Sequence, residues 1–366
     1  MDNLIKTLQN QSLWGAIITS LGVILIGYLL AKFKVLKQEG KGVINQIVLL
    51  ISLPALAFKG FMKDITVESL KQEGIILGVS LAFYIVLSVI AMVWVKFFSN
   101  GFNFKKSKVS NAVLGQSATQ SRALVMWMLL IFGSTTFFGL PIINSVYKEA
   151  VLSANIWNIS YRIFLYSFCF MVMAGLKFNK QNILKSMKTA LLNPIVIATF
   201  LGLVLWLLQL IPGTRVTVTT TNGKQEVVGW FELAKTLPAI EKIFATLSAT
   251  ASPLIWITIG MTLASVSLMN AVKDKWVWIF TALKLIAIPL LVFFVMWPLY
   301  ANGLVTKQTA SAMVVFAAVP PATVAVAYSM KYKLHETFSA QCSALSTVAA
   351  VIMMPIWIII LGAVFV

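Results

Sequence analysis

Polar side chains lie beside prolines inside long apolar segments, and these are the residues most suited to bind a ligand. Ser134, Thr135 and Thr136 come one to two turns before Pro141, and Asn144 follows it by one turn. Hydroxyl and amide groups at such positions bond a carboxylate, or pair with backbone groups that a proline leaves free. For each residue alone, the simpler explanation is a bond to its own i−4 carbonyl. Only as a group do they indicate a binding site.

A similar arrangement of a polar residue beside prolines lies in the C-terminal half. Thr323 follows Pro320 and Pro321, where a new helical segment would begin. The first turn of a helix has N–H groups without acceptors, and its dipole attracts anions. If the segments around Gly139-Leu-Pro141 and Pro320-Pro321 break near mid-membrane and cross, two helix N-termini point at one spot. We therefore predict an anion site that includes Ser134, Thr135, Thr136, Gly139, Pro141, Asn144, Pro320, Pro321 and Thr323.

Two cations, Arg162 and Lys284, also fall inside apolar segments. Each lies eight residues, or about 12 Å, from one end of its segment. An unpaired cation at the membrane centre costs roughly 2.5–3.5 kcal/mol, so a functional role is the default hypothesis. Snorkelling towards the interface or a structural contact is the alternative. We add both residues to the predicted substrate site, with Arg162 holding an anion or orienting the polar groups near Pro141.

The composition excludes a soluble enzyme. Of 366 residues, 59% are apolar and 11% are charged, against about 25% charged in soluble domains. The net charge of +18 lies mainly in short loops between apolar segments, which fits membrane orientation better than nucleic-acid binding. Both cysteines, Cys169 and Cys342, lie inside apolar segments, and His335 is the single histidine. We therefore expect no disulfide framework, metal site or cofactor.

Ten segments are long and apolar enough to cross a bilayer as helices. They are 14–31, 43–61, 74–98, 123–147, 154–177, 191–211, 238–268, 276–300, 307–330 and 336–364. The loops after the odd-numbered segments hold 17 Lys and Arg, and the opposite side holds 10. The odd loops are therefore predicted to be cytoplasmic, with both termini outside the cell. The predicted location is the cell membrane, crossed many times.

Proline positions predict that the two halves of the chain repeat each other. Pro54 corresponds to Pro253, and Pro141 corresponds to Pro320. The predicted fold is all-α, with ten helices in two inverted five-helix repeats, 1–178 and 179–366, and with broken crossover helices 4 and 9. This pattern is typical of secondary transporters. Prolines are common in membrane helices, so a single one carries little weight.

An insertion at 212–237 has the pattern of a small β-hairpin. Its polar and apolar residues alternate on both sides of Asn222-Gly223, which is a strong turn signal. We expect this hairpin outside the cell, as a decoration or as a shield or dimer contact.

Acidic residues are absent from the predicted spans. Proton-coupled carriers and many sodium-coupled carriers use a buried carboxylate. Carboxylate-based coupling is therefore disfavoured, while a sodium ion held by carbonyls and hydroxyls stays an alternative. Export of an anion from a negative-inside cell needs no coupling ion.

Short motifs along residues 14–364 resemble the auxin efflux carrier family of membrane transport proteins. The motifs are Leu53-Pro54-Ala55-Leu56, Phe138-Gly139-Leu140-Pro141 with Val146-Tyr147, Asn193-Pro194, Pro253-Leu254 with Gly260 and Leu263, Lys284 with Pro289, Pro320 with Tyr332, and Ser346-Thr347 with Pro355. Ser134 and Thr323 depart from the family pattern, which often has Asn near these places.

The resemblance implies ten helices and a crossing of helices 4 and 9 at Pro141 and Pro320. It also implies a scaffold domain, 14–61 and 191–268, and a moving transport domain, 74–177 and 276–364. Members export plant auxin or, in bacteria, are associated with malate, malonate and similar carboxylates. A homodimer formed through the scaffold is the expected assembly.

The predicted function is therefore transport of a small organic anion, by export or exchange with alternating access. The main alternative is a transport-inactive receptor or scaffold of the same fold. An intramembrane enzyme is disfavoured because no carboxylate pair, and no His beside a Ser or Cys, falls at membrane depth. A channel is a further alternative, against which saturable counterflow would argue.

Overall fold

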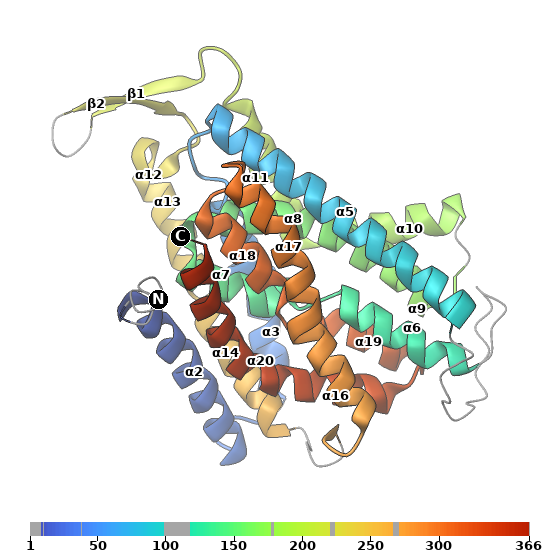
Figure 1. Ribbon diagram of the computed structural model, residues 1–366. Helices are drawn as coiled ribbons and strands as arrows, with labels where there is room; N and C mark the ends of the chain where they lie inside the picture. The colour runs from blue at the N-terminus through green and yellow to red at the C-terminus, as the bar shows by residue number, and fades with distance from the viewer. Residues whose placement is uncertain are drawn as a thin grey trace.

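The computed structural model describes residue 9 and residues 11–37, 39–98, 118–176, 179–219, 224–265 and 271–365. These residues are mostly helical, and a two-stranded sheet projects from one end of the bundle (Figure 1). Among the described residues, six helices are long and apolar enough to cross a membrane: Gly40–Lys59, Val67–Val95, Lys148–Met173, Pro238–Ser265, Lys275–Ala301 and Glu336–Val364. Four shorter apolar helices are Ile18–Lys32, Arg122–Ile131, Thr135–Val146 and Pro194–Leu208.

Several of these helices contain short π-helical or 3-10 segments, labelled η. In the first part of the chain the elements are α2 Gln11–Lys32, α3 Gly40–Ile47, η1 Val48–Ser52, α4 Leu53–Lys59, α5 Val67–Phe98, α6 Ala118–Ile131, η3 Thr135–Gly139, α7 Leu140–Val146, η4 Lys148–Ala150, α8 Val151–Phe164, η5 Leu165–Cys169 and α9 Phe170–Met173. In the second part they are α10 Lys180–Leu191, α11 Pro194–Leu208, β1 Arg215–Thr219, β2 Gln225–Gly229, α12 Leu233–Thr236, α13 Pro238–Ala249, α14 Ala251–Ser265, α16 Lys275–Ala282, η6 Leu283–Ala287, α17 Ile288–Ala301, α18 Lys307–Ala317, α19 Thr323–Lys331 and α20 Glu336–Val364.

Some helix ends differ from the hydropathy prediction. The third predicted span begins at Val67 rather than at residue 74, because backbone hydrogen bonding continues through a polar first turn. Glu73 therefore lies inside a span, and the expectation that no acid does so is wrong. The predicted loop before residue 191 is the helix α10, which ends before the next helix starts. Asn193 caps that next helix, α11, by accepting a bond from the N–H of Ile195 at 2.9 Å.

Three prolines follow π-helical segments instead of breaking their helices. Pro54, Pro141 and Pro289 are each the second residue after a five-residue π segment, namely η1, η3 and η6. A proline lacks an N–H and clashes with the i−4 carbonyl of a regular helix. The wider π turn changes which carbonyl the helix presents to that ring. Pro141 thus lies inside a helix that begins before it.

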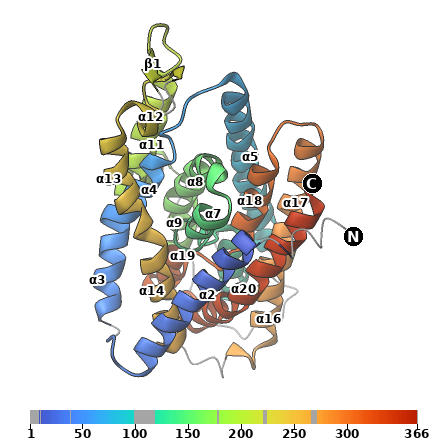
Figure 2. The same cartoon turned by 90° about the vertical axis from the view of Figure 1, so that its left-hand side faces the viewer.

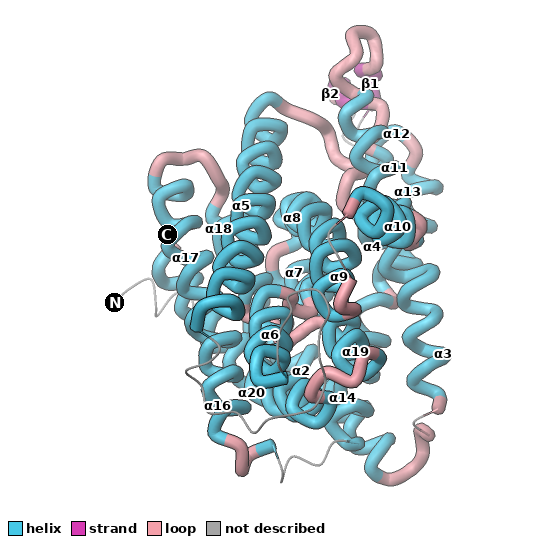
Figure 3. Tube along the Cα trace, turned by 90° about the vertical axis from the view of Figure 1, so that its right-hand side faces the viewer, coloured by secondary structure: helices cyan, strands magenta, loops and turns pink. Residues whose placement is uncertain are grey.

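The helices form two groups around a shared centre. In Figure 2, α3, α4, α13 and α14 stand on one side, α2 runs obliquely past α14 towards the middle, and α5, α16 and α17 stand on the other side. Between them lie α7, α8, α18 and α19. Figure 3 places loop segments in the middle of the bundle as well as at its ends, near α6, α7 and α19. These central loops are the breaks within the fourth and ninth predicted spans, at residues 132–134 and 318–322.

The predicted hairpin is confirmed by two antiparallel strands, β1 and β2. Their register runs from Arg215 opposite Gly229 to Thr219 opposite Gln225. The turn predicted at Asn222-Gly223 lies outside the described residues. At the base of the hairpin, Asp64 accepts a bond from the N–H of Gly229 at 3.1 Å and one from Arg215 at 2.7 Å. The hairpin is therefore attached to the loop that joins α4 to α5.

Candidate functional site

The two helix breaks meet and pair their backbones. The N–H of Ser134 donates to the carbonyl of Pro320 at 2.7 Å, and the N–H of Ala322 donates to the carbonyl of Phe132 at 2.8 Å. Gly133 and Pro321 form an isolated antiparallel bridge between these bonds. A backbone that leaves a helix inside a membrane protein must satisfy its polar groups within the protein. Here each break satisfies the other.

The crossing point differs from the one that the resemblance implies. The crossing residue of the fourth predicted span is Gly133, whereas Pro141 lies eight positions later in α7. Gly133 permits the approach because it has no side chain: an added Cβ would stand 2.6 Å from the Cγ2 of Val319 and 2.9 Å from the Nζ of Lys284. The prediction for the ninth span is close, since Pro320 and Pro321 both lie at the crossing.

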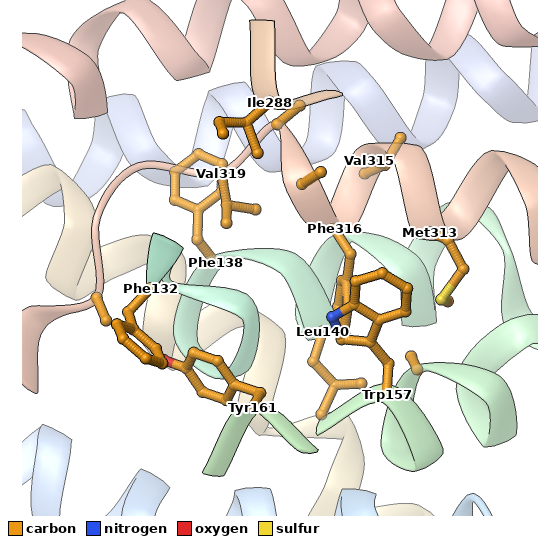
Figure 4. Close-up of a cluster of buried hydrophobic side chains, with 14 of the residues drawn as sticks. Phe132, Phe138, Leu140, Trp157, Tyr161, Ile288, Met313, Val315, Phe316 and Val319 are labelled. Carbon is orange, nitrogen blue, oxygen red and sulfur yellow. The ribbon is translucent and has the colours of Figure 1, made fainter. Parts of the chain in front are cut away.

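Apolar side chains pack around the crossing (Figure 4). The rings of Phe132 and Tyr161 lie beside each other with centroids 6.4 Å apart, and Phe138 lies beside Val319. Gly139 faces the ring of Phe316, which an added Cβ would approach to 2.8 Å. This packing holds the two breaks in place and gives Gly139 a structural contact.

A cavity of about 430 Å³ borders the crossing. Six of the predicted site residues line it: Ser134, Thr136, Arg162, Pro320, Pro321 and Thr323. The first turns of the helices that follow the breaks, at Thr136-Phe137 and Thr323-Val324, both form part of its wall. N–H groups in such turns have no acceptor within their own helix. The cavity therefore brings together two helix starts, one at Thr323 as predicted and one at Thr135 rather than at Pro141.

Other elements complete the wall with residues that were not predicted. They are Lys41 and Asn45 in α3, Asn193 before α11, Thr258 and Thr262 in α14, Tyr161 and Tyr166 in α8 and η5, and Ser343 and Thr347 in α20. Asn193 and Thr347 belong to motifs quoted for the family resemblance, but their sequence positions do not place them beside Thr136. Lys41 entered the sequence prediction only as one of the positive charges of a predicted cytoplasmic loop. No local pattern in the sequence connects these residues, because they come from separate helices.

Arg162 is the buried cation on the cavity wall. It is 4% exposed, and one guanidinium nitrogen, Nη1, donates to the hydroxyl of Thr199 at 2.6 Å. Thr199 in turn donates to the carbonyl of Ile195, which orients the pair. The other terminal nitrogen, Nη2, has no partner in the described part of the chain. Nη2 is itself buried, and a guanidinium fork on a cavity wall with one unpaired donor is suited to bind a carboxylate.

The remaining predicted residues do not line the cavity. Thr135 donates to the side chain of buried Asn158 at 2.7 Å, and the carbonyl of Pro141 accepts a 3.4 Å bond from Ser252 in α14. Asn144 is partly buried in α7. Lys284 is 1% exposed, and its Nζ donates to the carbonyl of Leu130 at 2.7 Å, near the C-terminus of α6. These contacts, together with that of Gly139, stabilise the elements behind the cavity.

The described residues include no cluster of three or more His, Cys, Asp or Glu that could hold a metal ion.

Comparison with curated proteins found no match. The family of membrane transport proteins matches residues 14–358, which is most of the chain. The match, together with the apolar helices of the chain, identifies a multi-pass membrane transporter. The chain belongs to the membrane transport protein family.

Proposed function

We propose that this transporter carries small organic anions, carboxylates in particular, across the cell membrane by alternating access. The observation that supports the proposal best is Arg162, a buried cation on the cavity wall with a free donor and no carboxylate bonded to it in the described residues. A buried charge without a partner is costly, and a bound anion removes that cost. Hydroxyls of Ser134, Thr136 and Thr323 on the same wall supply further donors.

The proposed architecture has ten membrane crossings in two inverted repeats, 1–178 and 179–366. A scaffold domain, 14–61 and 191–268, holds the side of the cavity that contains Asn45 and Thr258. A transport domain, 74–177 and 276–364, holds the crossing and Arg162, and moves against the scaffold. Two copies associate through their scaffolds in the lipid bilayer, with neither nucleic acid nor a cofactor as a partner. The cycle moves an anion and includes no catalytic step.

Export is the favoured direction for such a substrate. In a negative-inside cell, an outgoing anion gains about 2.3 kcal/mol per charge per 100 mV. That energy is enough to concentrate a monoanion outside the cell without a coupled ion. An imposed membrane potential should therefore change the rate of efflux in the direction set by the charge of the substrate.

The test is flux of radiolabelled malate from proteoliposomes containing the purified protein. Below saturation, Arg162→Ala should reduce the rate roughly 10- to 100-fold, since a hydrogen bond to a charged group contributes about 1.5–3 kcal/mol. The flux of Arg162→Lys should lie between that of the wild type and that of Arg162→Ala, because lysine keeps the charge but lacks the planar guanidinium fork. Arg215→Ala, which removes an arginine from the hairpin, is the matched control and should transport like the wild type.

Each outcome is decisive. Equal flux through wild type and Arg162→Ala would reject the role of Arg162. Binding of malate without flux would support the transport-inactive receptor, and flux that does not saturate or show counterflow would support a channel. Failure of malate, malonate and other carboxylates both to bind and to move would reject the proposed substrate class.

A further inference from the structure

Glu73 is a buried carboxylate outside the cavity. It lies in α5, in the segment Val67–Val95 that is long and apolar enough to span a membrane, and it is 4% exposed. The start of α5 follows Asp64, which bonds the base of the hairpin, so this is the hairpin end of the molecule. Figure 1 shows α5 beginning near that end. Glu73 therefore lies apart from the crossing and has no part in the proposed anion site.

One carboxylate oxygen is hydrogen-bonded and the other is not. Oε1 accepts a bond from the hydroxyl of Ser153 in α8 at 2.6 Å and one from Gln72 at 3.2 Å. Ser153 also lies 3.3 Å from the hydroxyl of Thr309 in α18. Oε2 is buried and has no hydrogen-bond partner in the parts of the chain that the structure describes. The carboxylate thus has half of its bonding capacity unused.

No cation forms an ion pair with Glu73 among the described residues. Lys63, in the loop before α5, donates its Nζ instead to the backbone carbonyl of Glu149 at 3.2 Å. Burial lowers the pKa of Lys63, and the carboxylates of Glu149 and Glu73 oppose this shift. Five charged groups at the same end of the adjoining elements are exposed: Glu68 and Lys71 on α5, Lys148 and Glu149 on η4, and Lys307 on α18. The buried Arg162 lies near the other end of α8, nine residues after Ser153.

The surroundings can support both forms of the carboxyl group. Ser153 and Thr309 are each the third residue of their helices, so Glu73 faces the positive ends of two helix dipoles, which stabilise a negative charge. The lack of an ion pair and the unpaired oxygen favour the neutral, protonated form, because a buried charge without compensation tends to be neutralised. A bound metal cation would need more oxygen ligands than these two hydroxyls and the carboxylate supply. A proton needs only the free oxygen.

We propose that Glu73 is a proton-binding site at the hairpin end of the α5, α8 and α18 bundle, and that its occupancy changes during the transport cycle. One proton from water on the hairpin side binds to Oε2 and converts the carboxylate to a neutral carboxyl group, and its release reverses the step. No bond other than O–H forms or breaks. The link to the transport cycle rests on the proposed function, whereas the site itself does not.

The first test is infrared difference spectroscopy of the full-length purified protein, titrated from about pH 6 to about pH 9, a range in which ordinary exposed carboxyl groups stay ionised. A carbonyl band of a protonated carboxyl should appear as the pH falls. It should be absent in Glu73→Gln and retained in Glu149→Gln, which removes an exposed carboxylate nearby. If Glu73→Gln keeps the band, or if the band does not change with pH, the proposal is overturned. If added sodium removes the band at constant pH, the site binds a metal cation and the proton assignment is wrong.

Ser153→Ala tests the same site while keeping the carboxyl group, in case Glu73→Gln does not fold. This variant removes a donor that stabilises the ionised form, so the band should persist to higher pH than in the wild type. An unchanged titration would overturn the assignment of the band to Glu73.

The second test measures malate flux from proteoliposomes at different pH values on the hairpin side. Wild-type flux should change with pH by at most about tenfold per unit, a slope that a one-proton titration approaches only beyond its midpoint. The flux of Glu73→Gln should not change. If flux is absent from both proteins while the infrared result holds, the substrate proposal has failed and the proton site remains. Equal pH dependence in both proteins would reject the link to transport.

Discussion

At the scale of single residues, the protein treats its two buried cations differently. Lys284 donates to the carbonyl of Leu130 near the end of α6, where unpaired carbonyls and the negative end of the helix dipole offset its charge. Arg162 lines the cavity, bonds the neutral hydroxyl of Thr199 and has one buried terminal nitrogen, Nη2, without a partner in the described residues. Both residues looked alike in the sequence, since each lies eight positions into an apolar segment. The contact of Lys284 supports the crossing, whereas the unpaired nitrogen of Arg162 fits its proposed role in binding the anion.

Lys284→Ala should therefore affect stability strongly. The variant leaves a void and an unpaired carbonyl in the core, so we expect the free energy of unfolding to fall by about 2–4 kcal/mol. Thermal or denaturant unfolding in detergent measures this change. Lys273→Ala, which removes an exposed lysine shortly before α16, should stay within about 0.5 kcal/mol of the wild type. A Lys284→Ala protein as stable as that control would show that the Leu130 contact contributes little.

At the scale of helices, α2 and α14 touch through their backbones. A Cβ on Gly27 would overlap the backbone of Ile257, and one on Gly260 would overlap the backbone of Ile24. Lipid tails are as apolar as leucine, so helices in membranes associate through close packing at small residues. The two glycines let these helices approach closely.

Gly260→Ala should separate the two helices. Because the obstructing atoms belong to the backbone and cannot rotate away, we expect a loss of about 1–3 kcal/mol in unfolding free energy. Gly22→Ala in α2 is the matched control. An added Cβ there meets nothing within 4 Å, so it should be neutral or stabilise the helix by about 0.5–1 kcal/mol. Similar unfolding midpoints for the two variants would contradict this account of the contact.

At the scale of the whole molecule, the cavity and the hairpin lie towards opposite ends. The cavity wall includes Ala327, an exposed residue of α19, and the helix α19 lies in the half of the molecule farther from the hairpin (Figure 3). Away from that opening, Ser252 of α14 bonds the carbonyl of Pro141 in α7 and joins the two helix groups. We interpret this arrangement as one state of an alternating-access cycle, with the cavity open on the side away from the hairpin.

Labelling with a membrane-impermeant maleimide tests this interpretation. Cys169 and Cys342 are buried and free, so background labelling of the wild type should be low. The positive-inside pattern predicts that Thr217→Cys, in the exposed strand β1, reacts in intact cells. Ala327→Cys should react in inverted vesicles, and a transported carboxylate should slow that reaction. Labelling of both variants from the same side would reject either the orientation or the direction in which the cavity opens.

The sequence by itself determined the membrane class, the positions of the apolar segments, the hairpin and the presence of prolines near two helix breaks. These features depend on local composition and turn chemistry, which neighbouring residues carry. Only the tertiary structure decided that the chain crosses at Gly133 rather than Pro141, and that Asn193 and Thr258 share a cavity with Arg162. It also decided that Glu73 is buried. Each of these facts rests on contacts between distant segments, such as the bond across 80 positions from Ser153 to Glu73, and hydropathy along the chain cannot report which segments will meet.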